Sequence, residues 1–405
     1  MKSILVFVVC YLFSSVMAQE LPGLAIEGTK LEPITFDKFL SEARERNSWV
    51  LNKKLSIESA TAFKDQVSVV NLSPSFSYSR GSFYQKAPME SFRSPQSNTY
   101  TLSGTIEGMG KRQARTDSAA AEIVRQSANL NSLLDGVDVD GASLFLDAIR
   151  VKLILAANQN TLNHLSKLTA AEAVQEFTGQ KKVRIDLIND FRYFSLGMAS
   201  YMGRKYIDVL PEPKSTFLID LKDFDLKQLI TEAGKSRTDL LEMEAASKLA
   251  EANLILAKKN RNLDISVSVY NTQSPAYEAS GYSYGRGSSI GMSLSIPIPV
   301  SQLYDSDLVQ ASNYKMQLEI SLEEARNRVQ FEVNQAFLQY NSAKSKLGNA
   351  LQERKKTALK LDQKSAKVIM DAYAGETDLI DAQINYAKAF IFLSKVAGLK
   401  KALPL

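Results

Sequence analysis

The chain has 405 residues, of which 45% are hydrophobic and 23% are charged, and its formal net charge is +5. This composition is typical of a folded protein, which excludes a disordered chain. The Lys and Arg residues are scattered without an interleaved aromatic platform, so the sequence gives no support to nucleic-acid binding.

The first segment, residues 1–18, has the organisation of a secretory signal peptide. Lys2 gives a basic start, residues 4–13 form an apolar run, and Ala18 is the small residue that a signal peptidase needs. The run is shorter than the roughly 20 residues of a membrane-spanning helix. We therefore predict that this signal is removed and that the mature chain is exported.

Two features restrict how the mature chain is stabilised and how it meets a membrane. The only cysteine, Cys10, lies in the predicted signal, so we expect no disulfide in the mature protein. The most apolar later segment, residues 144–157, is interrupted by Asp147, Arg150 and Lys152. If the mature chain enters a membrane, we expect it to do so as strands.

The mature sequence contains two related halves. Residues 71–77 are echoed by residues 262–268, and the paired landmarks follow in the same order in both halves. The segment Pro211-Glu212-Pro213 separates the halves. We therefore predict two structural repeats, residues 19–210 and 211–405.

Long helices are predicted where prolines are absent, because proline disrupts a helix interior. No proline falls in residues 96–210 or 300–403. Apolar and small residues recur at three-and-four spacing between Leu303 and Ala374, which predicts a coiled-coil-like helix of roughly 100 Å. A nearly equal helix is predicted from Lys111 to Phe177. Apolar residues beside the main stripe indicate neighbours on two sides, as in a closed ring of helices.

Four segments alternate with the period of a β-strand, with apolar residues on one face and Ser, Thr and Gly on the other. They lie around residues 75–79, 99–106, 264–269 and 289–298. An uncharged hydroxyl face opposite an apolar face is typical of strands between a water-filled lumen and lipid. The loops at 81–96 and 272–287 are rich in Tyr, Phe, Ser and Gly, as expected for an aromatic girdle and an exposed outer face.

Four strands are too few to close a membrane barrel, because an open edge in lipid leaves backbone groups unpaired. Several chains must therefore share one barrel. Two copies would give eight strands with a filled lumen, whereas three would give twelve strands and an open pore. The predicted fold class is mainly α with membrane β, and we favour a trimer with four strands from each protomer.

The sequence resembles a known family, the outer-membrane efflux proteins typified by TolC. The resemblance lies in the tandem arrangement of strands and helices and in two short motifs. These are Ile296-Pro297-Ile298-Pro299 and Tyr373-Ala374-Gly375, which leads into Leu379-Ile380-Asp381-Ala382-Gln383. It covers essentially the whole mature chain, although the spacing from Gly375 to Asp381 is shorter than is usual in the family.

The resemblance implies a homotrimer with a twelve-stranded barrel in the outer membrane, continued by a helical barrel in the periplasm. It implies passive exit of solutes or polypeptides delivered by a periplasmic adaptor protein and an inner-membrane pump, with no cofactor. Shorter helices would pair with the long ones. The segments expected to form them are Phe36 to Gln66, Gly179 to Lys205, Leu226 to Arg261 and Glu376 to Leu399.

The candidate gate lies after the second long helix. If Gly375 marks the periplasmic hairpin turn, Asp378 and Asp381 begin the returning helix, and threefold symmetry would arrange them as a carboxylate ring that favours cations. Alternatively, these acids only complement the helix dipole. By the resemblance, Tyr373 would join neighbouring hairpins through its hydroxyl group; otherwise it packs at the turn.

The matching hairpin of the first repeat contains Gly179, Asp186 and Asp190. We predict that Gly179, like Gly375, adopts a left-handed turn conformation and helps to fix where an adaptor docks. The two acids, Asp186 and Asp190, are either part of the periplasmic tip or solvated helix surface.

An enzyme is not expected. The single histidine, His164, lies in a predicted helix and no cysteine remains after processing, so neither a zinc site nor a histidine-dependent triad is available. The remaining alternative to a duct is a trimeric stalk or adhesin. Such proteins usually concentrate their strands at one end of the chain, whereas here strands occur in both halves, which favours the duct.

Overall fold

The computed structural model describes residues 30–69, 74–82, 96–204, 209–214, 222–279, 282–298, 302–358 and 365–399. The predicted signal and the loop at 83–95 lie outside the described residues, as does Pro299. The chain divides into two compact units, each built from both halves of the sequence. The helical unit lies within residues 1–56, 127–243 and 322–405, and the sheet unit within 57–126 and 244–321.

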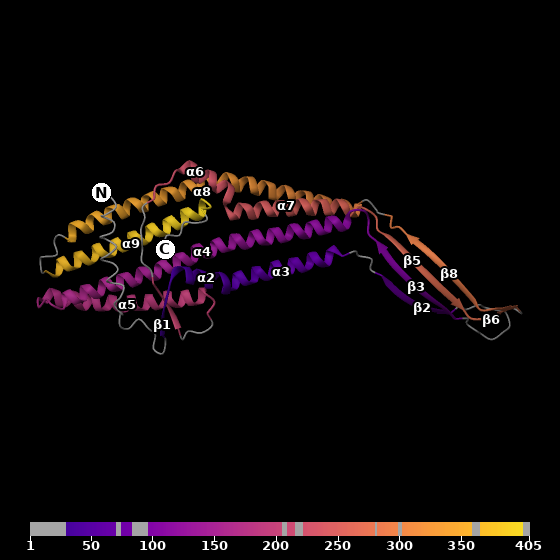
Figure 1. Ribbon diagram of the computed structural model, residues 1–405, viewed down its shortest axis with the longest axis horizontal. Coiled ribbons are helices and arrows are strands. Elements are labelled where there is room, and N and C mark those ends of the chain that lie inside the picture. Colours follow the sequence, from indigo (N-terminus) through magenta and orange to yellow (C-terminus); the bar gives the residue numbers. More distant parts are fainter. Residues whose placement is uncertain are drawn as a thin grey trace. The chain divides into compact units, whose positions relative to one another are not determined.

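In each half of the chain a short strand and two helices precede the strands of the sheet, and two long helices follow them (Figure 1). The first half contains β1 (Lys30–Ile34), α2 (Phe36–Arg46), α3 (Ser48–Ser68), β2 (Ser75–Ser82), β3 (Gln96–Ile106), α4 (Lys111–Leu165) and α5 (Ala171–Tyr201). The second contains β4 (Val209–Pro213), α6 (Leu226–Ser236), α7 (Thr238–Lys259), β5 (Ile265–Ser274), β6 (Tyr277–Ala279), β7 (Tyr282–Tyr284), β8 (Gly287–Ser295), α8 (Gln302–Ala358) and α9 (Ala366–Val396). The expectation of a mainly helical fold with four principal strands is confirmed.

The predicted ends of the two long helices are wrong. Helix α4 ends at Leu165 and not at Phe177, and α8 ends at Ala358 and not at Ala374. The return helices α5 and α9 therefore begin earlier than predicted. The start of α9 is set by Ser365, whose side chain accepts a hydrogen bond from the Val368 backbone N–H. This cap satisfies a donor that the first helical turn leaves without a partner.

The two predicted helices that precede the strands, Phe36 to Gln66 and Leu226 to Arg261, are each interrupted once. Asn47 separates α2 from α3, and Arg237 separates α6 from α7. The Asn47 side chain accepts from the Trp49 N–H and donates to the Tyr201 carbonyl, so it caps one helix and ties it to α5. The break therefore has a local cause in an Asx-type cap.

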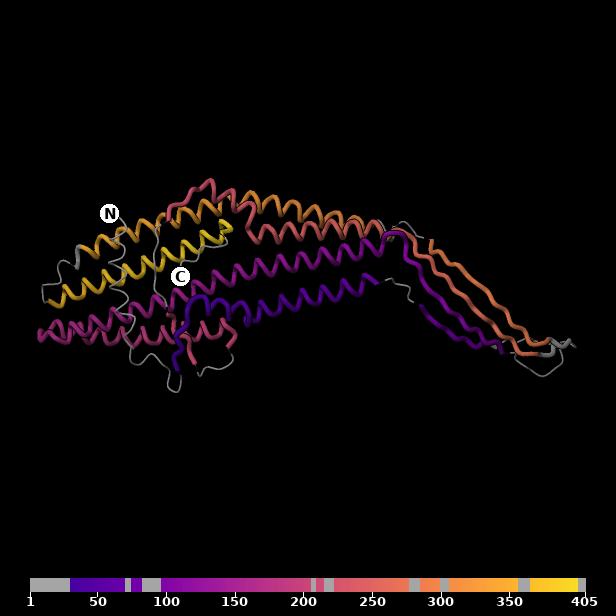
Figure 2. The backbone as a smooth tube through the Cα atoms, viewed as in Figure 1, coloured from indigo at the N-terminus to yellow at the C-terminus, as the bar shows by residue number. Residues whose placement is uncertain are grey.

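The sheet unit contains an antiparallel sheet with the strand order β2-β3-β5-β8, whose strands run side by side in Figure 2. Its register places like residues in cross-strand rows. One row contains Ser75, Ser103, Ser268 and Ser293, and the adjacent row on the opposite face contains Phe76, Leu102, Val269 and Met292. The alternation predicted from the sequence therefore gives one hydroxyl face and one apolar face.

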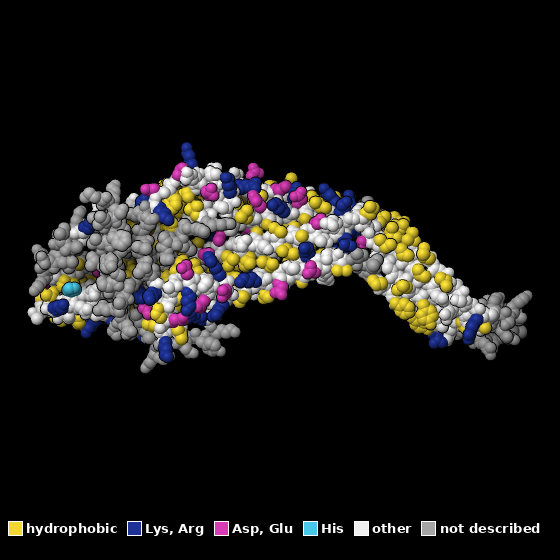
Figure 3. Space-filling model, in the orientation of Figure 1, with side chains coloured by type: hydrophobic (Ala, Val, Ile, Leu, Met, Phe, Trp, Pro, Cys, Tyr) yellow, Lys and Arg dark blue, Asp and Glu magenta, His cyan; other side chains and the backbone are white. Residues whose placement is uncertain are grey.

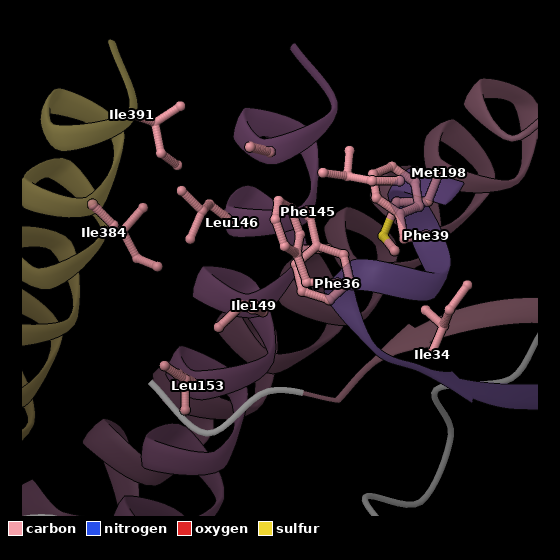
Figure 4. Close-up of a cluster of buried hydrophobic side chains, with 14 of the residues drawn as sticks. Ile34, Phe36, Phe39, Phe145, Leu146, Ile149, Leu153, Met198, Ile384 and Ile391 are labelled. Atoms are coloured by element: carbon pink, nitrogen blue, oxygen red, sulfur yellow. The ribbon is translucent and has the colours of Figure 1, made fainter. Parts of the chain in front are cut away.

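One hydrophobic core cluster of the helical unit lies where α2, α4, α5 and α9 meet (Figure 4). Phe145 of α4 is fully buried, and its ring centroid lies 5.3 Å from that of Phe36 and 5.5 Å from that of Phe39. Ile384 and Ile391 of α9 belong to the same cluster. Burial of these side chains stabilises the helical unit through the hydrophobic effect.

The proline-rich segment between the halves is part of the same unit. Pro211-Glu212-Pro213 belongs to β4, which pairs in parallel with β1. Lys152 of α4 reaches this strand and pairs with Glu212 at 2.7 Å. A two-stranded ribbon is consistent with the prolines, because each strand has an edge where no backbone donor is needed.

Candidate functional site

Two ion pairs join α4 to α9 in the helical unit. Arg150 donates to both carboxylate oxygens of Asp381, at 2.6 and 3.0 Å, and Lys388 donates to both oxygens of Asp147, at 2.7 and 2.8 Å. The hydrogen bonds that Arg150 donates to Asp381 raise the pKa of Arg150 above its ordinary value. Each helix contributes one cation and one anion, so the pairs fix the antiparallel register of α4 against α9.

The predicted carboxylates of α9 differ in their surroundings. Asp381 is paired with Arg150, which offsets its charge, whereas Asp378 is exposed and forms no ion pair with a described residue. Neither lies in a first helical turn, because α9 begins at Ala366. The helix dipole therefore does not account for these acids, since its effect is confined to the terminal turn.

Tyr373 lies on α9 beside the hydrophobic core of the helical unit. Burial raises the pKa of its hydroxyl group, and a hydrogen bond with Asn158 acts in the opposite direction. Asn158 of α4 is itself fully buried and donates to the side chain of Gln180 of α5 at 2.6 Å. Tyr373 therefore belongs to a polar contact between helices and does not mark a turn.

The prediction that Gly179 and Gly375 adopt left-handed turns is wrong. Both are interior residues, of α5 and α9 respectively, and neither has a positive φ. In the first repeat the described turn lies instead at residues 166–170, and the segment 359–364 between α8 and α9 lies outside the described residues. The two glycines are accommodated in helices at a cost of about 1 kcal/mol each relative to alanine.

The two acids of the first repeat lie on an exposed face of α5. Asp190 is close enough to Arg150 for its negative charge to contribute to the raised pKa of that guanidinium. Asp186 forms no ion pair with a described residue. The structure therefore brings Asp190 to the Arg150–Asp381 pair and leaves Asp186 on the surface.

Sequence reasoning missed the basic partners Arg150 and Lys388. The signal was present, because Asp147 and Arg150 interrupt an otherwise apolar run of α4. Charged residues in a packed helix are usually paired. This rule marks Asp147 and Arg150 as paired residues, but it does not identify their partners on α9, which the packing of the two helices determines.

The hydroxyl face of the sheet unit is joined across strands by side-chain hydrogen bonds. Ser75 and Ser103 lie 2.7 Å apart, Ser268 and Ser293 2.6 Å, and Thr99 and Thr272 3.1 Å, measured between hydroxyl oxygens. These bonds use part of the hydrogen-bonding capacity of the face, and each hydroxyl oxygen has a further lone pair for water.

The opposite face is apolar and open to the surroundings. Ile290 is 78% exposed and Met292 is 72% exposed. Figure 3 shows hydrophobic side chains gathered over the visible face of the sheet, with few charged groups among them. In the cross-strand row of Ile290, Tyr78 and Tyr100 pack with ring centroids 5.2 Å apart, and the Tyr78 hydroxyl group donates to Asn98. An apolar patch of this kind marks a surface that another apolar phase or protein covers.

Neither unit contains a described group of His, Cys, Asp and Glu that could hold a metal ion. Among the described helices, none has the length and apolar character that crossing a bilayer requires.

No family model and no curated protein matches this sequence. Solved structures do match it. CusC, a protein that forms a transmembrane channel, has a TM-score of 0.71 at 13% identity, over 94% of this chain and 96% of that one. The outer membrane protein VceC of Vibrio cholerae has a TM-score of 0.64 at 11% identity, over 90% and 96%. The open state of the MtrE outer membrane channel of Neisseria gonorrhoeae has a TM-score of 0.64 at 15% identity, over 91% and 90%. The chain therefore has the fold of these outer-membrane channels, which confirms at the level of the fold the resemblance to the TolC-like proteins.

Proposed function

We propose that this chain is one protomer of a trimeric exit duct in the outer membrane, through which solutes or polypeptides leave the periplasm. Three four-stranded sheets join into a twelve-stranded barrel, and the helices continue the duct into the periplasm. The duct acts without chemistry of its own, and a periplasmic adaptor protein and an inner-membrane pump supply cargo and energy.

The observation that carries this proposal is the division of the sheet into two faces. Its apolar side chains are exposed on one face, where lipid would cover them, and its Ser and Thr side chains occupy the other, where water would fill a lumen. Strands β2 and β8 are the two ends of the strand order. Joining β8 of one protomer to β2 of the next satisfies both edges, as a sheet in lipid requires.

The helices also present surfaces that fit further copies of the chain. Helix α3 exposes Trp49 and Phe63, and α8 exposes Met316, Ile320 and Phe331. Large apolar side chains repeated along one helix are typical of helix–helix contacts. In the proposed trimer these side chains pack against the helices of neighbouring protomers.

The gate of the duct is proposed at the α4, α5 and α9 helices of the helical unit. Asp378 and Asp381 supply carboxylates, and Tyr373 supplies a polar contact between helices. The proposed periplasmic gate and tip region also includes four residues that form part of the helix surfaces. These are Gly179, Asp186 and Asp190 of α5 and Gly375 of α9. The clamp formed by Arg150 and Asp381 holds α9 against α4, so release of this contact is the proposed first step of opening.

Conductance through planar lipid bilayers tests the function. The purified protein, reconstituted from detergent, is expected to be a trimer that gives discrete current steps. A lumen lined with hydroxyl groups passes small ions of both signs, so the steps should persist in potassium chloride and in salts of larger ions. A trimer that inserts into the bilayer but never conducts, even with Arg150→Ala, would instead favour the stalk or adhesin. A soluble monomer would contradict both functions.

A further inference from the structure

The hydroxyl face of the sheet contains one large side chain among its described residues. Its cross-strand rows consist of Ser, Thr and Gly, except for the row of Ser77, Thr101, Tyr270 and Gly291. Tyr270 lies on β5, and its partner on β8 is Gly291. The position of this ring therefore decides how much of the space above the hydroxyl face is open.

The Tyr270 ring lies over Gly291. A Cβ atom added at Gly291 would overlap Cζ and Oη of Tyr270 and would lie 2.8 Å from its Cε2. Real Cβ atoms do not approach other carbon atoms so closely, so the ring occupies the volume of the missing side chain. The ring consequently lies flat across the backbone of β8.

The glycine is needed for space and not for backbone conformation. Gly291 lies within a regular strand, and the described glycines with positive φ are Gly110, Gly203 and Gly398. Any residue could adopt its backbone angles, and a β-branched residue would suit a strand better than glycine does. The glycine is therefore explained by the ring above it.

We propose that Tyr270 sets the effective width of the duct within the sheet, and that Gly291 keeps its ring flat and the lumen wide. This inference rests on the proposed function, because it requires the hydroxyl face to line a lumen. In the trimer, three Tyr270 rings lie at one level. A side chain at position 291 would push each ring away from the sheet, and three displaced rings would narrow the passage together.

A purely structural role is the alternative reading. Aromatic rings stabilise glycines of edge strands by covering their backbone, and β8 is at the end of the strand order. In that case the pair contributes to sheet stability and has no effect on passage. The two readings differ in what happens when both residues are changed.

Cysteine labelling from outside the cell separates the readings, because the predicted mature chain has no cysteine of its own. Two reporters on β3 lie on either side of Thr101, the β3 residue in the Tyr270 row. Thr105→Cys lies on the helix side of the ring, and the matched control Thr99→Cys lies on the loop side. The probe is a membrane-impermeant poly(ethylene glycol) maleimide, which reaches Thr105→Cys only by passing the rings.

Gly291→Val is expected to slow labelling of Thr105→Cys severalfold and to leave labelling of Thr99→Cys unchanged. Adding Tyr270→Ser to Gly291→Val should restore the labelling rate, and Tyr270→Ser alone should equal or exceed the original rate. An equal loss at both reporters, or no recovery in the double variant, would overturn the inference. If neither reporter reacts in the otherwise unchanged chain, the hydroxyl face does not line a lumen, and the proposed function fails together with this inference.

Discussion

Arg150 and Asp381 lie 231 positions apart in the sequence and form a two-pronged hydrogen-bonded ion pair between α4 and α9. Both side chains are partly exposed, so water screens the pair and its contribution to folding is small, about 0.5–1 kcal/mol. Its geometry nevertheless fixes one helix against the other, because a guanidinium and a carboxylate share a plane and two parallel bonds. A contact that is weak but fixed in orientation is suited to a gate, because it holds α9 against α4 and can be released at a small cost in free energy.

Arg150→Ala should loosen α9 from α4 and raise the single-channel conductance of the reconstituted trimer. The cause is the loss of both hydrogen bonds, which leaves the paired Lys388 and Asp147 as the remaining ion pair between these helices. The conductance of single channels in planar bilayers measures the effect.

Asp378→Asn is the matched control, because Asp378 is an exposed carboxylate on the same helix without an ion pair to a described residue. It should alter cation preference more than conductance. The exchange Arg150→Asp with Asp381→Arg should return the conductance toward its original value. If Arg150→Ala conducts as the unchanged protein does, the clamp is not part of the gate.

The strands could be predicted from the sequence because apolar residues lie on one face of the sheet and Ser and Thr lie on the other. Ser268 and Val269 are neighbours in sequence and lie on opposite faces, and the observed register pairs them with Ser103 and Leu102. A period of two restricts the register of strand pairing, because a shift of one strand by one residue would move its apolar side chains to the hydroxyl face. The order β2-β3-β5-β8 required the structure, because alternation does not state which strands pair.

The helix ends could not be predicted so well because glycine was given too much weight. Gly375 and Gly179 are the turn-forming residue type, yet packing on both sides of α9 and α5 outweighs their low helix propensity. The true start of α9 depends on a single serine cap, Ser365, which resembles many other serines in the chain. The ion pairs of α4 with α9 needed the tertiary structure, since no local pattern relates Arg150 to Asp381.

Glu32→Gln should reduce stability in a pH-dependent manner. The hydrogen bond from Lys38, together with Arg204, lowers the pKa of Glu32 below its ordinary value. A lowered folded-state pKa stabilises the fold above the unfolded value of about 4.3, and this stabilisation is lost as the pH falls through the folded value.

The expected loss at pH 7 is about 0.5 kcal/mol, a small value because the pair is partly exposed. Urea unfolding of both proteins at a series of pH values measures it, and the two stabilities should converge as the pH falls below the lowered folded-state pKa of Glu32. A difference that remains constant with pH would show that the substitution acts through packing.

Phe145→Ala should be among the most destabilising single substitutions in the helical unit. The side chain is fully buried, and its ring contacts Phe36 and Phe39, so its removal leaves a cavity in the cluster where α2, α4, α5 and α9 meet. Replacement of a buried phenylalanine by alanine typically costs about 3–5 kcal/mol. Thermal unfolding followed by circular dichroism measures the loss. Phe145→Leu, which fills most of the cavity, should lose much less; equal losses would mean that the site has collapsed around both side chains.

Disulfide cross-linking between strands β2 and β8 tests how copies of the chain join. Within one chain β3 and β5 lie between these strands, so their backbones are separated by about 14 Å, three times the strand spacing. Two cysteines cannot form a disulfide when their Cα atoms are more than about 7 Å apart. Any disulfide between β2 and β8 must therefore join two different copies.

Ser77→Cys combined in turn with Ser289→Cys, Ser293→Cys and Ser295→Cys samples three registers on the hydroxyl face of the sheet without adding a side chain at Gly291. In a closed barrel, one register should give a covalent trimer on oxidation in the membrane, because each edge meets only one partner edge. Ser77→Cys alone is the control and should remain monomeric on a denaturing gel. Ladders beyond the trimer would indicate an open assembly, and no cross-linking in any of the three registers would count against pairing of β2 with β8, the contact on which the shared lumen depends.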